Sequence, residues 1–143
     1  MGVGVCVAAL AWLAALCIYD VRQRRLPNWL TLPGALAAVG LAALAGRGLP
    51  ALAGACALGA LYLAVHMVAP SAMGAGDVKL ALGVGAIGGY FGVDVWLLAA
   101  LAAPLITSAW ALIELLRRGT RTVPHGPAMC LATAVAAALA IIS

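Results

Sequence analysis

Long apolar runs alternate along this chain with short segments that hold most of its charged residues. A helix needs about 20 apolar residues to cross the roughly 30 Å hydrocarbon core of a bilayer. The pattern predicts six transmembrane helices, at residues 2–19, 29–46, 50–69, 77–92, 95–116 and 125–142. We therefore expect an all-α fold, a polytopic membrane helical bundle that forms a single membrane-embedded domain over residues 1–143.

The composition favours a membrane protein and excludes several other classes. Hydrophobic residues make up 66% of the 143-residue chain and charged residues only 8%, whereas an ordinary soluble domain has roughly 25% charged residues. This excludes a water-soluble globule and a soluble nucleic-acid-binding protein, and makes the lipid bilayer an expected partner. The four cysteines lie inside apolar runs and form no C-x-x-C pair, so we expect neither a metal nor another cofactor.

The basic residues predict how the bundle is oriented. The first, third and fifth connections hold or adjoin most of them, while the second holds only Arg47. The residues on the richer side are Arg22, Arg24, Arg25, Lys79, Arg117, Arg118 and Arg121. Because cytoplasmic loops of membrane proteins carry an excess of Lys and Arg, these connections should face the cytoplasm and both termini should lie outside.

The chain has only four acidic residues, Asp20, Asp77, Asp94 and Glu114. An ionised group at the centre of a membrane helix costs about 2.5–3.5 kcal/mol on insertion scales, so each acid needs an explanation. Counting the crossings puts Asp20 and Asp77 at the same, cytoplasmic side and Asp94 at the other. Two carboxyl groups that are close together in a partly dry site tend to share one proton. Such a pair can activate a water and polarise a carbonyl, as aspartic proteolysis requires.

Both acids also have a purely structural interpretation. Asp77 precedes a predicted helix and could be its N-cap, accepting backbone N–H groups. Asp20 could form an interfacial ion pair with Arg22 or Arg24. A Ser/His protease is disfavoured, because Ser71 lacks a nucleophile motif.

Three short motifs carry a resemblance to a known family. They are Tyr19-Asp20 with Arg22, followed by Leu26-Pro27-Asn28; Gly74-Ala75-Gly76-Asp77-Val78-Lys79; and Pro124-His125-Gly126-Pro127. Their order, at the first, fourth and sixth predicted helices, resembles the type IV prepilin peptidases, which are membrane aspartic proteases with a G-x-G-D motif. Larger members also methylate the new N-terminus and carry an extra cytoplasmic segment with C-x-x-C pairs. This chain is more similar to the short, peptidase-only members of tight-adherence (Flp) pilus systems, so we expect no separate methyltransferase or soluble domain.

The resemblance implies an aspartic endopeptidase of the bacterial inner (cytoplasmic) membrane that removes the leader of type IV (Flp-like) prepilin or pseudopilin precursors at the cytoplasmic face. It implies that Asp20 and Asp77 are the catalytic pair. The expected site-shaping residues are Pro27, Asn28, Gly74, Gly76, Lys79, Gly126 and Pro127. His125 departs from the family pattern, in which an aromatic or aliphatic residue is expected.

The residues themselves suggest how some of these positions act. Gly74 and Gly76 should permit a tight turn and a close approach of substrate to Asp77. Pro27 should end the first helix and Asn28 should cap the second. Lys79, two residues after Asp77, should point elsewhere and act first as a snorkelling interfacial cation.

Two other functions stay open on the sequence. One is a small proton-coupled membrane transporter, in which a buried carboxyl group titrates while a substrate crosses. The other is a catalytically inactive pilus-assembly membrane protein that only holds precursors in the membrane.

Overall fold

The computed structural model describes residues 3–23, 26–71, 73–117 and 123–142. Within these residues the chain forms six α-helices and no strand, and the structure is 89% helical. The helices are α1 (Val3–Gln23), α2 (Asn28–Leu44), α3 (Gly48–Val68), α4 (Ala75–Phe91), α5 (Val93–Leu116) and α6 (Gly126–Ile142). The predicted all-α fold is therefore confirmed, and five helices lie within about two residues of their predicted limits. The exception is α1, which continues to Gln23, so that Asp20 belongs to a helix rather than to the loop in which we expected it.

The bundle has the surface of a membrane protein. Helices α1, α3 and α5 are long and apolar enough to span a bilayer, and α2 and α6 are shorter apolar helices. Large apolar side chains such as Leu36 of α2, Leu101 of α5 and Leu139 of α6 are exposed on the outside. This distribution is expected where the surrounding medium is lipid, because burial of such side chains then gives no hydrophobic gain.

Helix α4 is the centre of the bundle and contacts α2, α3, α5 and α6. Its approach to α3 depends on glycine. A Cβ added at Gly54 would meet the carbonyl oxygen of Gly85, and one added at Gly85 would lie 2.5 Å from the carbonyl oxygen of Gly54. Beside this contact, Trp96 of α5 packs over Gly88 and donates from Nε1 to the carbonyl oxygen of Gly54 at 3.0 Å. Small residues thus bring the backbones together, which is how membrane helices gain van der Waals contact.

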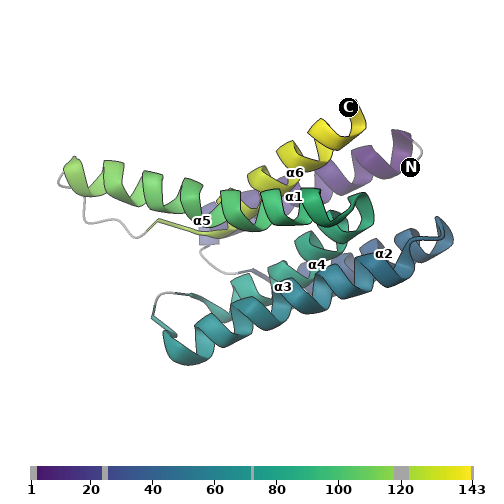
Figure 1. Ribbon diagram of the computed structural model, residues 1–143. Coiled ribbons are helices and arrows are strands. Elements are labelled where there is room, and N and C mark those ends of the chain that lie inside the picture. Colours follow the sequence, from purple (N-terminus) through teal and green to yellow (C-terminus); the bar gives the residue numbers. More distant parts are fainter. Residues whose placement is uncertain (1–2, 24–25, 72, 118–122, 143) are drawn as a thin grey trace.

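The helix directions place the two ends of the chain together. The start of α1 and the end of α6 lie at one end of the bundle, and the α3–α4 connection lies at the other (Figure 1). Asp20, near the end of α1, and Asp77, near the start of α4, therefore lie at the same end. Asp94 is in the first turn of α5 and lies at the opposite end of the bundle. The 17 residues of α4 separate these two ends of the bundle by about 25 Å.

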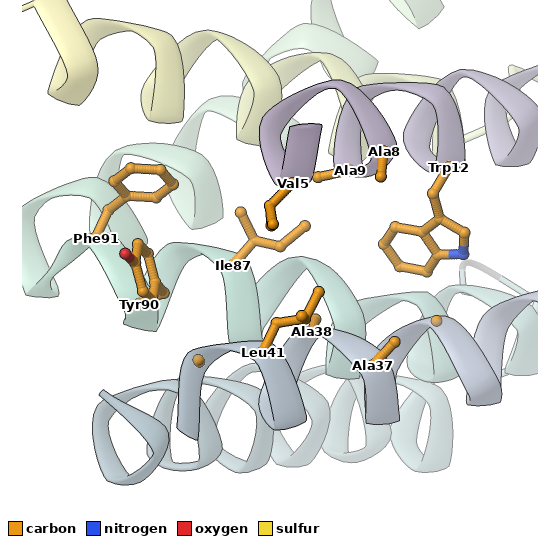
Figure 2. Close-up of a pocket in the computed structure, with 12 residues that line it drawn as sticks. Val5, Ala8, Ala9, Trp12, Ala37, Ala38, Leu41, Ile87, Tyr90 and Phe91 are labelled. Carbon is orange, nitrogen blue, oxygen red and sulfur yellow. The ribbon is translucent and has the colours of Figure 1, made fainter. Parts of the chain in front are cut away.

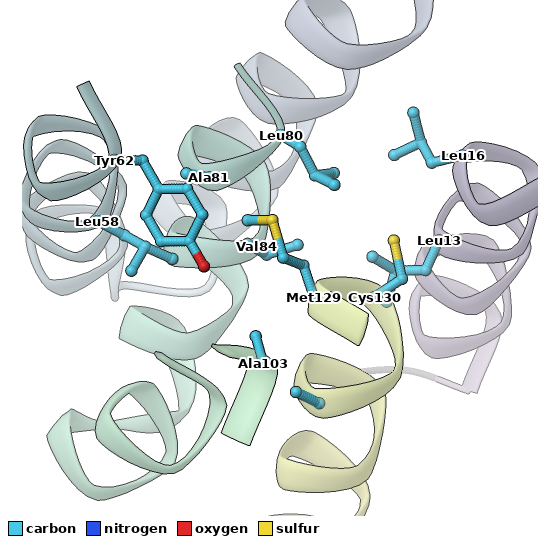
Figure 3. Packing of buried hydrophobic residues seen from close by; sticks show 11 residues of the cluster. Leu13, Leu16, Leu58, Tyr62, Leu80, Ala81, Val84, Ala103, Met129 and Cys130 are labelled. Atoms are coloured by element: carbon cyan, nitrogen blue, oxygen red, sulfur yellow. The ribbon is translucent and has the colours of Figure 1, made fainter. Parts of the chain in front are cut away.

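A buried apolar cluster and the side chain of Trp12 fix α1 relative to the rest of the bundle. A buried cluster that includes Leu13 and Leu16 of α1 meets Leu80 of α4 and Met129 of α6 (Figure 3). An apolar pocket of about 210 Å³ separates α1 from α2, and Trp12 lies at one end of it (Figure 2). The indole Nε1 of Trp12 donates to the carbonyl oxygen of Leu30 at 2.9 Å, and its ring lies against Gly34 and Gly83. These contacts hold the C-terminal half of α1, with Asp20, against α2, α4 and α6.

Candidate active site

Asp20 and Asp77 line the same pocket, which has a volume of about 400 Å³. Its walls come from the end of α1, the α1–α2 connection and the start of α4. The lining residues are Asp20, Leu26, Asn28, Gly74, Ala75, Gly76, Asp77 and Lys79. The expectation from the number of crossings, that these two acids can meet while Asp94 cannot, agrees with this arrangement.

Asp20 lies deep in the pocket wall, with only 8% of its surface exposed. Gly126, the first residue of α6, packs directly against it. A Cβ added at Gly126 would lie 2.5 Å from Oδ2 of Asp20 and 3.1 Å from its Cγ. The position of the Asp20 carboxyl group therefore depends on the absence of a side chain at residue 126.

Asp77 is half-buried and lies in the first turn of α4. The N-cap of this helix is Gly74, so the idea that Asp77 is the N-cap is wrong. The backbone N–H of Asp77 donates to the carbonyl oxygen of Gly74 at 3.1 Å, and Oδ2 of Asp77 accepts from the backbone N–H of Gly74 at 3.3 Å. The carboxyl group thus stabilises the start of its own helix and at the same time faces the pocket, where the N-terminal end of α4 favours negative charge.

The two motif glycines provide space rather than a special backbone conformation. Gly74 has φ −74° and ψ 149°, values that any residue adopts, and Gly76 lies within α4. The expected tight turn that only glycine could make is therefore wrong. A Cβ at Gly74 would lie 3.4 Å from Oδ2 of Asp77, and one at Gly76 would lie 3.3 Å from Cβ of Leu26. Their hydrogen atoms keep the pocket open around Asp77 and Leu26.

Asn28 and Lys79 form a polar bridge beside the pocket. The Nζ of Lys79 donates to Oδ1 of Asn28 at 2.7 Å, joining α4 to the start of α2. This corrects two expectations. The N-cap of α2 is Pro27, and no side chain caps this helix. Lys79 is half-buried and lines the pocket instead of pointing away from it.

His125 forms partly buried contacts that the motifs alone did not predict. Its Nε2 lies 2.9 Å from Oη of Tyr62 and its Nδ1 lies 2.6 Å from Oγ1 of Thr107. Burial lowers the pKa of the His125 imidazole below its ordinary value of 6.5, and the negative charge of Asp20 opposes this shift only in part. In the sequence, only the departure of His125 from the family pattern indicated that this residue has a particular role.

Three further polar residues, His66, Ser71 and Glu114, do not line the pocket. Nδ1 of His66 lies 2.7 Å from the carbonyl oxygen of Met73, to which it must donate, so His66 holds the α3–α4 connection. Ser71 is exposed, and the contacts of His66 and His125 give no support to a Ser/His protease. Glu114 lies near the end of α5 and does not line the pocket.

Two arginines of the predicted cytoplasmic side lie in the described part of the chain. Arg22 is exposed near the end of α1 and Arg117 follows the end of α5. Arg24, Arg25, Arg118 and Arg121 lie outside the described residues. In the part of the chain that is described, no group of three or more His, Cys, Asp or Glu side chains is placed to hold a metal ion. Pro127 is the second residue of α6 and is half-buried beside Gly126.

Comparison with known proteins supplies an independent finding. A family model described as the type IV leader peptidase family matches residues 7–142, which is nearly the whole chain. The matched range includes Asp20, Asp77 and Gly126. No curated protein and no solved structure matches this chain.

Proposed function

Because this chain belongs to the type IV leader peptidase family, we propose that it is an aspartic endopeptidase that uses Asp20 and Asp77 around one water molecule. Family membership makes it a peptidase, with pilin-like precursors as its class of substrate. The observation that carries the aspartic mechanism is the shared pocket, in which two acids that are 57 positions apart in the chain line one cavity.

The pair can complete hydrolysis with its own protons. One carboxyl group is ionised and takes a proton from the bound water while the water oxygen attacks the carbonyl carbon of the scissile peptide bond. The other carboxyl group is protonated and gives its proton to the carbonyl oxygen. The tetrahedral intermediate then collapses, the C–N bond breaks, and the amine leaving group receives the proton that the first carboxyl group had taken. The second carboxyl group recovers its proton from the intermediate, so the net reaction consumes one water and regenerates the pair.

We expect the substrate to be extended at the cleaved bond and helical beyond it. The absence of a side chain at Gly74 leaves space beside Asp77 for the backbone of such a segment. The precursor should have a basic leader and a single apolar helix, with the cleaved bond at the membrane interface. We propose that the leader lies on the cytoplasmic side of the inner membrane and that the substrates are type IV (Flp-like) prepilin or pseudopilin precursors.

The orientation follows from the basic residues. Arg22 and Lys79 lie at the pocket end of the bundle, whereas Arg47 lies between α2 and α3 at the other end. The arginines outside the described residues fall in the first and fifth connections and add to the same bias. By the positive-inside rule this end faces the cytoplasm and both termini face outward. Cysteine labelling that reached position 22 only from the outside would overturn this orientation.

Cleavage of a purified pilin-type precursor, followed by product mass, tests the mechanism. Asp20→Asn and Asp77→Asn keep the size of the side chain but remove the acid, so each should abolish cleavage. The matched control is Asp94→Asn, the same change in the first turn of α5 at the opposite end of the bundle. Substantial cleavage by a folded Asp77→Asn protein would show that the proposed mechanism is wrong.

A further inference from the structure

His125 joins the start of α6 to two other helices. Its carbonyl oxygen accepts the first hydrogen bond of α6, from the backbone N–H of Met129 at 3.2 Å. Its side chain extends between α3, which provides Tyr62, and α5, which provides Thr107. The ring of His125 also packs against that of Tyr62, with centroids 5.6 Å apart. One residue therefore fixes both the backbone and the lateral position of the α6 N-terminus.

The hydrogen bonds assign the protons in this network. Oγ1 of Thr107 donates to the carbonyl oxygen of Ala103 at 3.0 Å. A hydroxyl group has a single hydrogen, so Thr107 can only accept from His125, and Nδ1 of the imidazole must hold the proton. In the neutral ring Nε2 is then an acceptor, and the Tyr62 hydroxyl donates to it. A protonated ring would present a second N–H to Tyr62 and displace this donor.

The apolar surroundings of Tyr62 favour the arrangement in which its hydroxyl group is hydrogen-bonded to His125. Tyr62 is 5% exposed and extends inward from α3 into the apolar cluster with Leu58, Val84 and Met129 (Figure 3). A hydroxyl group in an apolar environment costs free energy unless it is hydrogen-bonded. The His125 ring accepts the hydrogen bond of the Tyr62 hydroxyl group. If the imidazole moved away, this hydroxyl group would stay buried without an acceptor.

The residue after His125 touches Asp20, one of the two proposed catalytic acids. Gly126 packs against the carboxyl group of Asp20, close enough that an added Cβ would overlap Oδ2. We propose that His125 is a positioning residue, whose hydrogen bonds to Tyr62 and Thr107 hold Gly126 against Asp20 and so fix the orientation of that carboxyl group. This inference rests on the proposed function, because it assumes that Asp20 is one of the reacting acids.

The test measures kcat and KM for precursor cleavage by the full-length protein. His125→Phe keeps a flat ring but removes both hydrogen bonds, and it should lower kcat about 10- to 100-fold, the range expected when a reacting group moves by up to 1 Å, with KM unchanged. Tyr62→Phe and Thr107→Val each remove one hydroxyl group and should lower kcat less. Tyr62→Phe added to His125→Phe should cause no further loss, because the acceptor is already gone.

A matched control separates this role from a general loss of packing. Thr133 of α6 is buried and donates to the carbonyl oxygen of Met129 at 2.8 Å, the same type of bond that Thr107 makes to Ala103. Thr133→Val should therefore leave kcat unchanged, although it removes an equivalent hydroxyl group. In addition, the ¹⁵N chemical shifts of the His125 ring, in a variant that lacks His66, should show the Nδ1–H tautomer.

Each outcome decides between two claims. If Asp77→Asn is inactive but His125→Phe cleaves at the wild-type kcat, the positioning role is wrong and the proposed function stands. If Asp77→Asn retains cleavage, the proposed function is wrong. Should His125→Phe fail to fold, Tyr62→Phe and Thr107→Val decide, and wild-type kcat in both would overturn the inference. An Nε2–H tautomer would overturn it as well.

Discussion

Replacing Gly126 by alanine should disable the peptidase without unfolding it. The added Cβ would lie 2.5 Å from Oδ2 of Asp20, and an ordinary contact of 3.4 Å exceeds this separation by about 0.9 Å. The nearest atoms all belong to the Asp20 side chain, which can rotate, so the carboxyl group should move rather than the helices. A displacement near 1 Å in a reacting group can cost about 100-fold in rate, or about 2.7 kcal/mol.

The net loss of stability should be smaller than this, at most about 2 kcal/mol. Overpacking a well-packed site costs about 1–3 kcal/mol, and alanine recovers up to about 1 kcal/mol of helix propensity relative to glycine. The matched control is Gly40→Ala in α2, where an added Cβ meets nothing within 4 Å. This variant should keep wild-type activity and should not lower the melting temperature.

The assay is precursor cleavage in detergent or liposomes, with initial rates from product mass and thermal unfolding measured on the same samples. We expect Gly126→Ala to melt within a few degrees of the wild type and to cleave about 100-fold more slowly. If Gly126→Ala cleaved at the wild-type rate while Asp20→Asn was inactive, the contact between α6 and Asp20 would have no part in catalysis, and the reasoning above would be refuted.

Three further predictions follow from other contacts. Lys79→Met should slow precursor cleavage, because it removes the bridge to Asn28, and Asn28→Ala in that background should add little if the bridge is the cause. Gly85→Leu should lower the melting temperature by several degrees, because its Cβ would lie 2.5 Å from the carbonyl oxygen of Gly54 and force α3 from α4. The depressed pKa of His125 means that the unfolded chain binds a proton more readily, so stability is complete above pH 6.5 and falls as the pH drops below it. Melting curves between pH 8 and 5 should therefore decline less for His125→Phe than for the wild type, and equal declines would contradict this.

The helices and the meeting of the two acids could be predicted because both depend on the bilayer. An apolar run that matches the hydrocarbon thickness must be a helix, since no other segment satisfies its backbone in lipid. Each helix carries the chain to the other side of the membrane. Two helices, α2 and α3, lie between Asp20 and Asp77, so the chain returns to the side on which it left Asp20. One further helix, α4, carries the chain to the opposite side, where Asp94 lies.

The contacts around the acids could not be predicted, because they depend on the rotation of each helix about its axis. In a soluble bundle an apolar stripe identifies the inward face. Here almost every face is apolar, so the sequence did not show that Lys79 would turn toward Asn28 or that Tyr62 would meet His125, 63 positions away. Local signals also misled, since Asn28 has the chemistry of an N-cap but Pro27 occupies that position.

The depth of the two acids in the bundle favours hydrolysis over transport. A transporter needs an acid that titrates near the middle of the membrane, whereas Asp20 lies near the end of α1 and Asp77 is the third residue of α4. Peptide hydrolysis consumes water, while the apolar helix of the substrate is stable only in lipid. The membrane boundary is the depth at which both reactants are available, and there an ionised carboxyl group costs far less than at the helix centre. Moving the pair inward by a helical turn, about 5.4 Å, would raise that cost and remove the water, so the location of the pocket follows from the reaction that we propose.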